Sequence, residues 1–166
     1  MRAYNVGCLC GNLRYKATAP PLRVNYCHCR FCQRITGSSH LVEPVFEKAD
    51  FGRTSGSASV YKHRSAGSGK LIDIHFCATC GTKLFMTFER FPEVVGVFGG
   101  TFDDAAWAEG TQGVTRHLFL REAQPGTVIP AGVPCFEQHA ITNDGEPLDP
   151  KVYSEPHVVG TGPPAP

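Results

Sequence analysis

Cysteine residues carry the clearest chemical signal in this sequence of 166 residues. Seven of the eight cysteines lie in three short clusters, and only Cys135 lies outside them. The clusters are Cys8-Leu-Cys10, Cys27-His-Cys29-Arg-Phe-Cys32 and Cys77-Ala-Thr-Cys80. Cysteines that are two residues apart are poorly placed to bridge each other but well placed to bind one metal ion. The spacing therefore favours metal ligands over disulfides.

The three clusters account for two zinc sites. The first and third clusters together supply four thiolates, which close a tetrahedral site, and closed sites of this kind are structural. The middle cluster supplies three thiolates and leaves one coordination position for chemistry. Zinc deprotonates a coordinated thiol and acts as a Lewis acid on a carbonyl. Both effects suit the addition of a thiol to an aldehyde.

Spacing alone leaves two alternatives for the middle cluster. A fourth protein ligand, such as His28, His40 or His75, would complete the tetrahedron and make the site inert. Without such a ligand, water, a substrate thiolate or a carbonyl oxygen could bind there. The sequence does not decide between an open and a closed site.

Other uses of the cysteines agree less well with the sequence. Disulfides need an oxidising compartment, whereas the N-terminal residues contain no apolar signal segment, which predicts a cytoplasmic location. Iron–sulfur proteins usually carry longer series of regularly spaced cysteines. A redox sensor formed by Cys27 to Cys32 would need exposed thiols of low pKa, and this is a third hypothesis. Cys135 is expected to be a small buried apolar residue.

Polar residues surround the middle cluster. Arg30 and Arg34 place positive charges beside the thiolates, and an arginine can bind a carboxylate through two hydrogen bonds. We expect these arginines to bind the carboxylates of an acidic thiol such as glutathione; alternatively, they only offset the charge of the cluster. The Gly- and Ser-rich segment 65–70 could be a mobile lid with a basic anchor at Lys70, although such loops are usually only connections.

The cysteines are separated by short segments that alternate between apolar and polar residues. Frequent Gly and Pro between such segments predict an all-β fold with at most one short helix. Pro44 predicts that the expected strand at residues 40–46 is an edge strand or a bulged strand. The helix is expected near residues 103–108, with Asp103 and Asp104 as caps and Trp107 in the core. The expected strands are 13–17, 22–26, 40–46, 58–63, 70–76, 82–88, 93–98 and 115–121.

The first and third clusters each end in a glycine, as zinc knuckles do. Gly11 and Gly81 follow the last cysteine and supply the positive φ that a tight turn commonly needs. A metal ion shared by the two turns would staple the N-terminus to the middle of the sheet. We expect a zinc-binding domain over residues 1–140 and a proline-rich C-terminal tail over residues 141–166.

The overall composition narrows the range of partners. A net charge of +1 gives no reason to expect nucleic acid or an anionic membrane surface as a partner. No apolar run reaches the 18 residues of a membrane span. A chain of this length can bury a core of its own.

The motifs together resemble those of a known family. They are Gly7-Cys-Leu-Cys-Gly11, Leu13-Arg-Tyr15, Cys27-His-Cys29-Arg-Phe-Cys32-Gln-Arg34, Thr36-Gly-Ser38, Phe76-Cys-Ala-Thr-Cys-Gly81, Leu84 and Gly99-Gly-Thr-Phe-Asp103. In register from Gly7 to Phe136, the sequence resembles the glutathione-dependent formaldehyde-activating enzyme family. The related centromere protein V domain shares this pattern.

The resemblance implies a fold, a metal content and an activity. The fold is the β-tent, a zinc-supported all-β architecture. The activity is S-(hydroxymethyl)glutathione synthesis, which is a carbon–sulfur lyase activity in the reverse direction, with glutathione and formaldehyde as substrates. The resemblance implies a structural zinc held by Cys8, Cys10, Cys77 and Cys80, and a catalytic-type zinc held by Cys27, Cys29 and Cys32.

The leading hypothesis is thus a zinc enzyme that handles an adduct of a small thiol, such as glutathione, and a small aldehyde. The alternative is a non-catalytic zinc-binding module that binds a protein or a peptide on its sheet. Accessibility of the second zinc to added thiols would distinguish these two hypotheses.

Overall fold

The computed structural model describes residues 3–160, and these residues contain one α-helix and many short strands. The predicted all-β class with at most one short helix is confirmed. The chain divides into two compact units, one made of residues 1–24 and 43–114, the other of residues 25–42 and 115–166. Among the described residues, no helix is long and apolar enough to cross a membrane.

The first unit contains a small antiparallel sheet. Its strands are β1 (Tyr4–Gly7), β2 (Arg14–Ala17) and β5 (Phe51–Ser55), in the order β1-β2-β5. The register pairs Val6 with Tyr15, and Tyr15 with Arg53 on the other side. The ladder between β2 and β5 shifts register between Arg14 and Tyr15. The first cysteine cluster directly follows β1 in this sheet.

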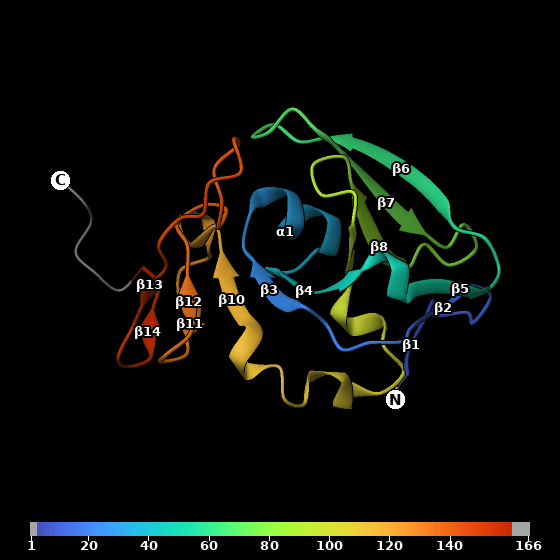
Figure 1. Ribbon diagram of the computed structural model, residues 1–166, viewed down its shortest axis with the longest axis horizontal. Coiled ribbons are helices and arrows are strands. Elements are labelled where there is room, and N and C mark those ends of the chain that lie inside the picture. The colour runs from blue at the N-terminus through green and yellow to red at the C-terminus, as the bar shows by residue number, and fades with distance from the viewer. Residues whose placement is uncertain (1–2, 161–166) are drawn as a thin grey trace. The chain divides into compact units, whose positions relative to one another are not determined.

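A second group of antiparallel strands in this unit carries the third cysteine cluster. It runs in the order β4-β9-β8-β7-β6, and β6, β7 and β8 lie side by side in Figure 1. The turn between β7 and β8 contains Cys77 and Cys80. The strands are β4 (Leu41–Glu47, of which residues 43–47 belong to this unit), β6 (Ser59–Arg64), β7 (Leu71–Phe76), β8 (Lys83–Phe88) and β9 (Val94–Val97).

Of the two alternatives expected for the strand at 40–46, the edge strand is wrong, because β4 is bonded on both sides, and the bulged strand stays a prediction. It pairs with β9 through Val45 and Gly96, and the N–H of Leu22 donates to the Val45 carbonyl at 2.8 Å. Pro44 is fully buried in this strand. A proline can occupy an interior strand only where no partner needs its missing N–H.

Aromatic and aliphatic side chains from both groups of strands form the core of the first unit. Phe46 is fully buried, and the rings of Tyr4 and Phe102 each lie 6.0 Å from its ring. Two metal-ligand candidates, Cys8 and Cys77, are part of this core. Its other buried members are Val6, Leu13, Ala17, Leu84, Phe85, Val95 and Val97.

The helix predicted near residues 103–108 is a 3-10 helix, η3 (Ala105–Ala108). Asp104 caps it by accepting from the N–H of Ala106 at 2.9 Å, as expected. Asp103 instead forms an ion pair with Arg14. Trp107 is half-buried and stacks on Phe102. Three more 3-10 helices lie in this unit, η1 (Lys48–Asp50), η2 (Gly99–Thr101) and η4 (Gln112–Val114).

The second unit contains the middle cysteine cluster. The last three residues of β3 (Arg23–Cys27) lie beside β10 (Thr115–Leu118), and β10 pairs in parallel with β12 (Pro134–Cys135). Figure 1 shows β3 and β10 next to each other, with α1 (Arg30–Thr36) following β3. The short helix η5 (Leu120–Glu122) follows β10.

The residues predicted to form a tail contribute two short strands to the second unit. β13 (Lys151–Val152) pairs with β12, and β14 (His157–Val158) pairs with β11 (Val128–Ile129). Hydrophobic periodicity could not predict these strands, because each is two residues long. The domain boundary at residue 140 stays a prediction.

Candidate metal centres

The first and third cysteine clusters come together in the first unit. The four sulfur atoms of Cys8, Cys10, Cys77 and Cys80 lie within 4.8 Å of one another. The Sγ of Cys10 lies 3.5 Å from that of Cys8 and 3.7 Å from that of Cys77. Four sulfur donors this close match the thiolate set that holds a structural tetrahedral zinc.

Two similar turns bring these sulfur atoms together. The carbonyl of Cys8 accepts from Gly11 at 3.0 Å, and that of Cys77 accepts from Gly81 at 2.8 Å. Both glycines have positive φ, 78° and 74°, as the glycine at the end of each cluster predicts. The N–H of Leu13 also donates to the Cys8 sulfur at 3.2 Å, a contact that favours a thiolate.

The middle cluster forms a compact group of three sulfur atoms in the second unit. The sulfurs of Cys27, Cys29 and Cys32 lie within 4.8 Å of one another. Cys27 ends β3, and Cys29 is the N-cap of α1, whose sulfur accepts from the N–H of Cys32 at 3.4 Å. The helix ends at Gly37, which has a left-handed conformation. A strand end and one helical turn thus present all three thiols to one point.

Charge within this group is concentrated on Cys29. Hydrogen bonds from the thiols of Cys27 and Cys32, with N–H groups of the helix start, lower the pKa of Cys29 to about 3. The pKa of Cys32 is raised, because its thiol donates to the neighbouring sulfurs and is buried. A soft, partly anionic donor set of this kind fits zinc.

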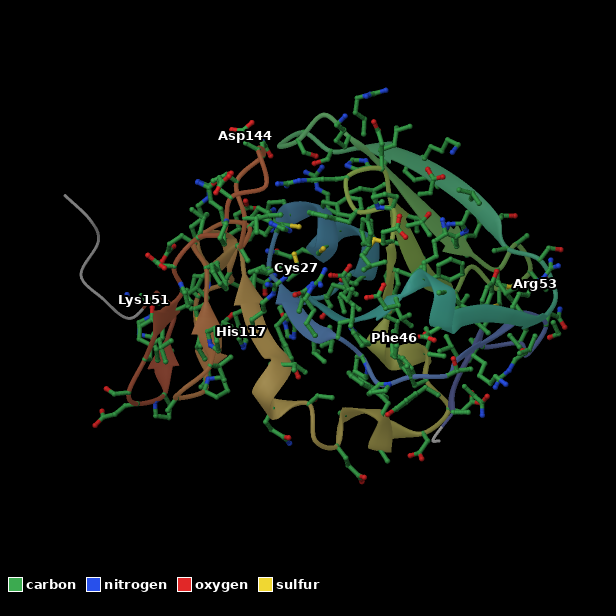
Figure 2. All side chains as sticks on the ribbon, viewed as in Figure 1. Cys27, Phe46, Arg53, His117, Asp144 and Lys151 are labelled. Atoms are coloured by element: carbon green, nitrogen blue, oxygen red, sulfur yellow. The ribbon has the colours of Figure 1, made fainter. Side chains whose placement is uncertain are left out.

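His28, between the first two of these cysteines, is anchored at three points in the second unit. Its N–H donates to the Leu118 carbonyl at 3.0 Å, and its carbonyl accepts from Gln33 Nε2 at 2.5 Å. Its Nε2 lies 3.0 Å from Nδ1 of His117 on β10. Figure 2 labels Cys27 and His117 on neighbouring strands. These contacts hold the backbone of the Cys27–Cys29 segment.

A fourth protein ligand is absent among the described residues of this unit. The group contains the three cysteines only, and neither His28 nor His40 joins them. The ring of His28 is fully buried and tilted against that of His40 at 5.2 Å. Burial lowers the pKa of both His28 and His117 to about 4, so both rings are neutral at pH 7. In the first unit, His75 stacks on Phe85 and lies 3.0 Å from the Thr87 hydroxyl.

Arg30 and Arg34 line one open pocket of about 340 Å³ in the second unit. They are four positions apart on α1 and thus project from one face of the helix. Polar side chains of Ser38, Ser39 and Gln124 complete the lining together with Gln33 and Gly37. The lining has no acidic side chain, so the pocket suits a hydrophilic anion.

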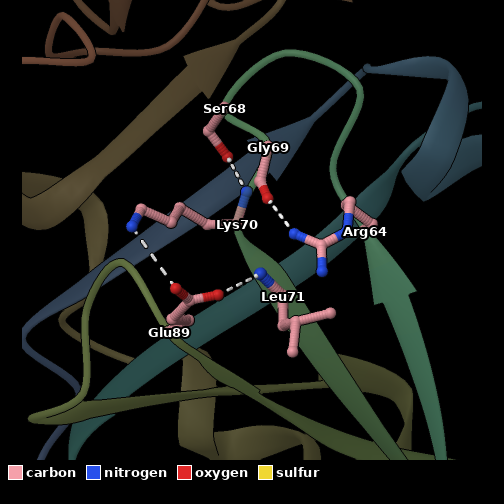
Figure 3. A network of polar contacts seen from close by, with 6 residues as sticks. All are labelled: Arg64, Ser68, Gly69, Lys70, Leu71 and Glu89. Atoms are coloured by element: carbon pink, nitrogen blue, oxygen red, sulfur yellow. Dashed lines mark hydrogen bonds and ion pairs between the residues drawn. The ribbon is translucent and has the colours of Figure 1, made fainter.

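The Gly- and Ser-rich segment 65–70 is an anchored loop in the first unit. Glu89 accepts from the N–H of Leu71 at 2.8 Å and pairs with Lys70 at 3.3 Å, and both contacts are drawn in Figure 3. Arg64 donates to the carbonyl of Gly69 at 2.7 Å. Lys70, the basic residue of this loop, is therefore paired with Glu89.

Three residues that shape the second site were not among the predicted site residues. His117, Glu122 and Gln33 contact the segment of the middle cluster. His117 and Glu122 lie about 90 positions from that segment, so only the fold could bring them there, whereas Gln33 directly follows Cys32 and has no special residue type that would mark it. Cys135 is buried in the small core with Leu120 and Ile129, as expected, and burial raises the pKa of its thiol.

Comparison with known proteins agrees with this arrangement. The family model described as "Glutathione-dependent formaldehyde-activating enzyme" matches residues 3–122, which include all three clusters. The chain belongs to this family. A Halomonas elongata protein named "Putative glutathione-dependent formaldehyde-activating enzyme" is 28% identical over 99 residues. That match covers 58% of this chain and 63% of the relative, which is less than two thirds of the relative's length.

A crystal structure of a Rhodobacter sphaeroides protein is also similar. It is 19% identical, with a TM-score of 0.48, and the match covers 60% of this chain and 87% of that chain. The residues matched by the family model include both thiol groups, each of which could hold a metal ion.

Proposed function

We propose that this protein is a zinc-dependent carbon–sulfur lyase that forms and cleaves the adduct of glutathione, or a similar acidic thiol, with formaldehyde or another small aldehyde. The observation that carries this proposal is the position of a three-thiol group at the start of the same helix that presents two arginines to a polar pocket. Family membership supports the same conclusion.

The two thiol groups would have different roles. Cys8, Cys10, Cys77 and Cys80 would hold a structural zinc, because four sulfurs complete its coordination. Cys27, Cys29 and Cys32 would hold the second zinc. When bound there, zinc supplies Lewis acidity and lowers the pKa of a thiol or polarises a carbonyl.

The residues of the chain would bind and orient the substrates. Arg30 and Arg34 are exposed and could each form paired hydrogen bonds with a carboxylate of glutathione. Ser38 and Ser39 offer hydroxyls along the same wall. Holding the thiol and the aldehyde together removes the entropic cost of their encounter.

The reaction is balanced without a redox partner. A carbon–sulfur bond forms between the thiol sulfur and the carbonyl carbon, the S–H proton is released, and one proton is taken up by the oxygen that becomes the hydroxyl. The reverse reaction restores the thiol and the aldehyde. A cytoplasmic location and the absence of nucleic-acid or membrane partners stay predictions.

Exchange spectroscopy by NMR tests the proposal. The exchange between free glutathione plus formaldehyde and their adduct is measured with and without a catalytic amount of zinc-loaded protein. We expect the wild-type protein to accelerate the exchange and Cys29→Ser not to accelerate it. At subsaturating glutathione, Arg34→Met should accelerate the exchange about tenfold less than the wild-type protein, because it lacks one charge-assisted bidentate contact. No acceleration by the wild-type protein with both zincs bound would favour the non-catalytic module.

A further inference from the structure

Gln33 connects the pocket to the middle cysteine cluster. It lies on α1, and only 5% of its surface is exposed. Its Nε2 donates to the carbonyls of His28 at 2.5 Å and Glu122 at 2.9 Å. Its Oε1 accepts from Nη1 of Arg30 at 2.5 Å and lies 3.4 Å from Nε2 of Gln124. Both donors and both lone pairs of the carboxamide are therefore used.

The partners fix the orientation of this amide. A backbone carbonyl can only accept and a guanidinium can only donate, so the nitrogen must face His28 and Glu122 while the oxygen faces Arg30. The groups that Gln33 contacts belong to both parts of the site. His28 stands in the sequence between two of the cysteines, whereas Arg30 and Gln124 line the pocket.

Glu122 strengthens the same junction from η5. Its Oε2 accepts from the N–H of Arg30 at 2.7 Å, at the first residue of α1. Its carbonyl accepts from Gln33. The first turn of the helix is therefore held by a side chain and a carbonyl of one residue that lies 92 positions away.

We propose that Gln33 is a positioning residue that sets both the thiol group and the arginine of the pocket, so that one side chain links metal affinity to ligand affinity. The expected effect on ligand binding rests on the proposed function, whereas the expected effect on metal affinity rests on the hydrogen bonds of Gln33. Removing the amide leaves the buried carbonyl of His28 without its donor and frees the guanidinium of Arg30, so both halves of the site loosen.

The test uses Gln33→Met, which keeps the length of the side chain and removes its polar atoms. Gln124→Met is the matched control. Gln124 also lines the pocket, but its Nε2 donates to Oε1 of Gln33, whereas the donor to the His28 carbonyl is Nε2 of Gln33. Zinc affinity of the second site is measured by chelator competition. Contacts that orient metal ligands are typically worth 10- to 100-fold in affinity, so we expect about a tenfold loss in Gln33→Met and none in the control.

Binding of S-methylglutathione, which has both carboxylates but no free thiol, reports the pocket alone. We expect Gln33→Met to weaken it about tenfold, and Arg30→Leu to weaken it similarly in the wild-type background but little in the Gln33→Met background. Gln33→Glu keeps an acceptor for Arg30 and loses the donor to His28, so it should lose zinc affinity as Gln33→Met does.

The outcomes separate this inference from the proposed function. Wild-type protein that binds zinc but not S-methylglutathione contradicts the proposed ligand, while the metal arm of the test still applies. Wild-type zinc affinity in both Gln33→Met and Gln33→Glu overturns the positioning role, as do additive losses from Gln33→Met and Arg30→Leu. A zinc loss in both Gln33 variants, absent in Gln124→Met, supports it.

Discussion

Removing the structural zinc that we propose for the first unit should destabilise that unit strongly. The double substitution Cys77→Ser and Cys80→Ser takes away every ligand of one turn, so that no ion can join it to the turn of Cys10. These turns are 67 positions apart at Cys10 and Cys77. For a closed loop of that length, the loss of chain entropy in the unfolded state corresponds to about 4 kcal/mol at 25 °C. This is a large share of a typical stability of roughly 5–15 kcal/mol.

Loss of the bound ion is not the only contribution to the expected destabilisation. Cys77 is buried at 3% exposure, and a serine hydroxyl there adds a cost of about 1–3 kcal/mol when it finds no partner. We therefore expect the midpoint of thermal unfolding to fall by about 10 °C or more. Wild-type protein stripped of zinc by a chelator should fall by nearly as much, since it loses the staple but keeps the buried sulfur.

Fluorescence of the single tryptophan makes the assay specific, because Trp107 lies in the first unit. Thermal melts followed at this residue are compared with zinc content for wild type, the double variant and Cys29→Ser. The Cys29→Ser control should change the tryptophan melt little, since its cluster lies in the second unit. A double variant that has lost one zinc and still melts within about 2 °C of wild type would refute the reasoning.

Three further substitutions test individual contacts. His117→Phe removes the hydrogen bond to His28. Because burial holds the pKa of His117 near 4, below its usual value, the stability of the wild-type protein should fall as the pH drops from about 6.5 towards 4. Urea titrations at pH 7 and pH 5 should show a smaller fall in stability for the variant than for the wild-type protein. Glu89→Ala should speed amide exchange at Leu71 while global stability changes little, since the lost ion pair is exposed. An unchanged exchange rate would contradict the anchoring of the loop by Glu89. Leu84→Ala, at a fully buried position, should cost about 2–5 kcal/mol in urea denaturation.

The two thiol groups could be predicted because their signal is local, whereas their role as metal ligands stays a prediction. A short turn with two cysteines and a following glycine specifies its own geometry, and the turns at Gly11 and Gly81 have the predicted positive φ. Which turn joins which also followed from counting, since four thiolates close one site and three remain. Eight strands were predicted within a few residues for the same reason, as alternation is a local pattern.

What the sequence did not predict depends on distant or weak signals. The α-helix Arg30–Thr36 is seven residues long, too short for a periodic pattern, and its N-cap is a cysteine rather than a usual capping residue. The helix expected at 103–108 formed only a 3-10 turn. His117 has no local mark as a partner of His28, because 89 positions separate them.

These two kinds of signal correspond to two ways of building a metal site. In the first unit the four thiols come from turns far apart in sequence, so a zinc ion bound there as proposed would contribute to folding, and its removal should lower the stability. In the second unit all three thiols come from residues 27–32, and closing so short a loop gains little from an ion. The geometry of that segment is instead supplied by protein contacts, from His117, Glu122 and Gln33. A site held in place by the fold can release, exchange or share a coordination position without unfolding, and the reaction proposed for the second thiol group would require this property.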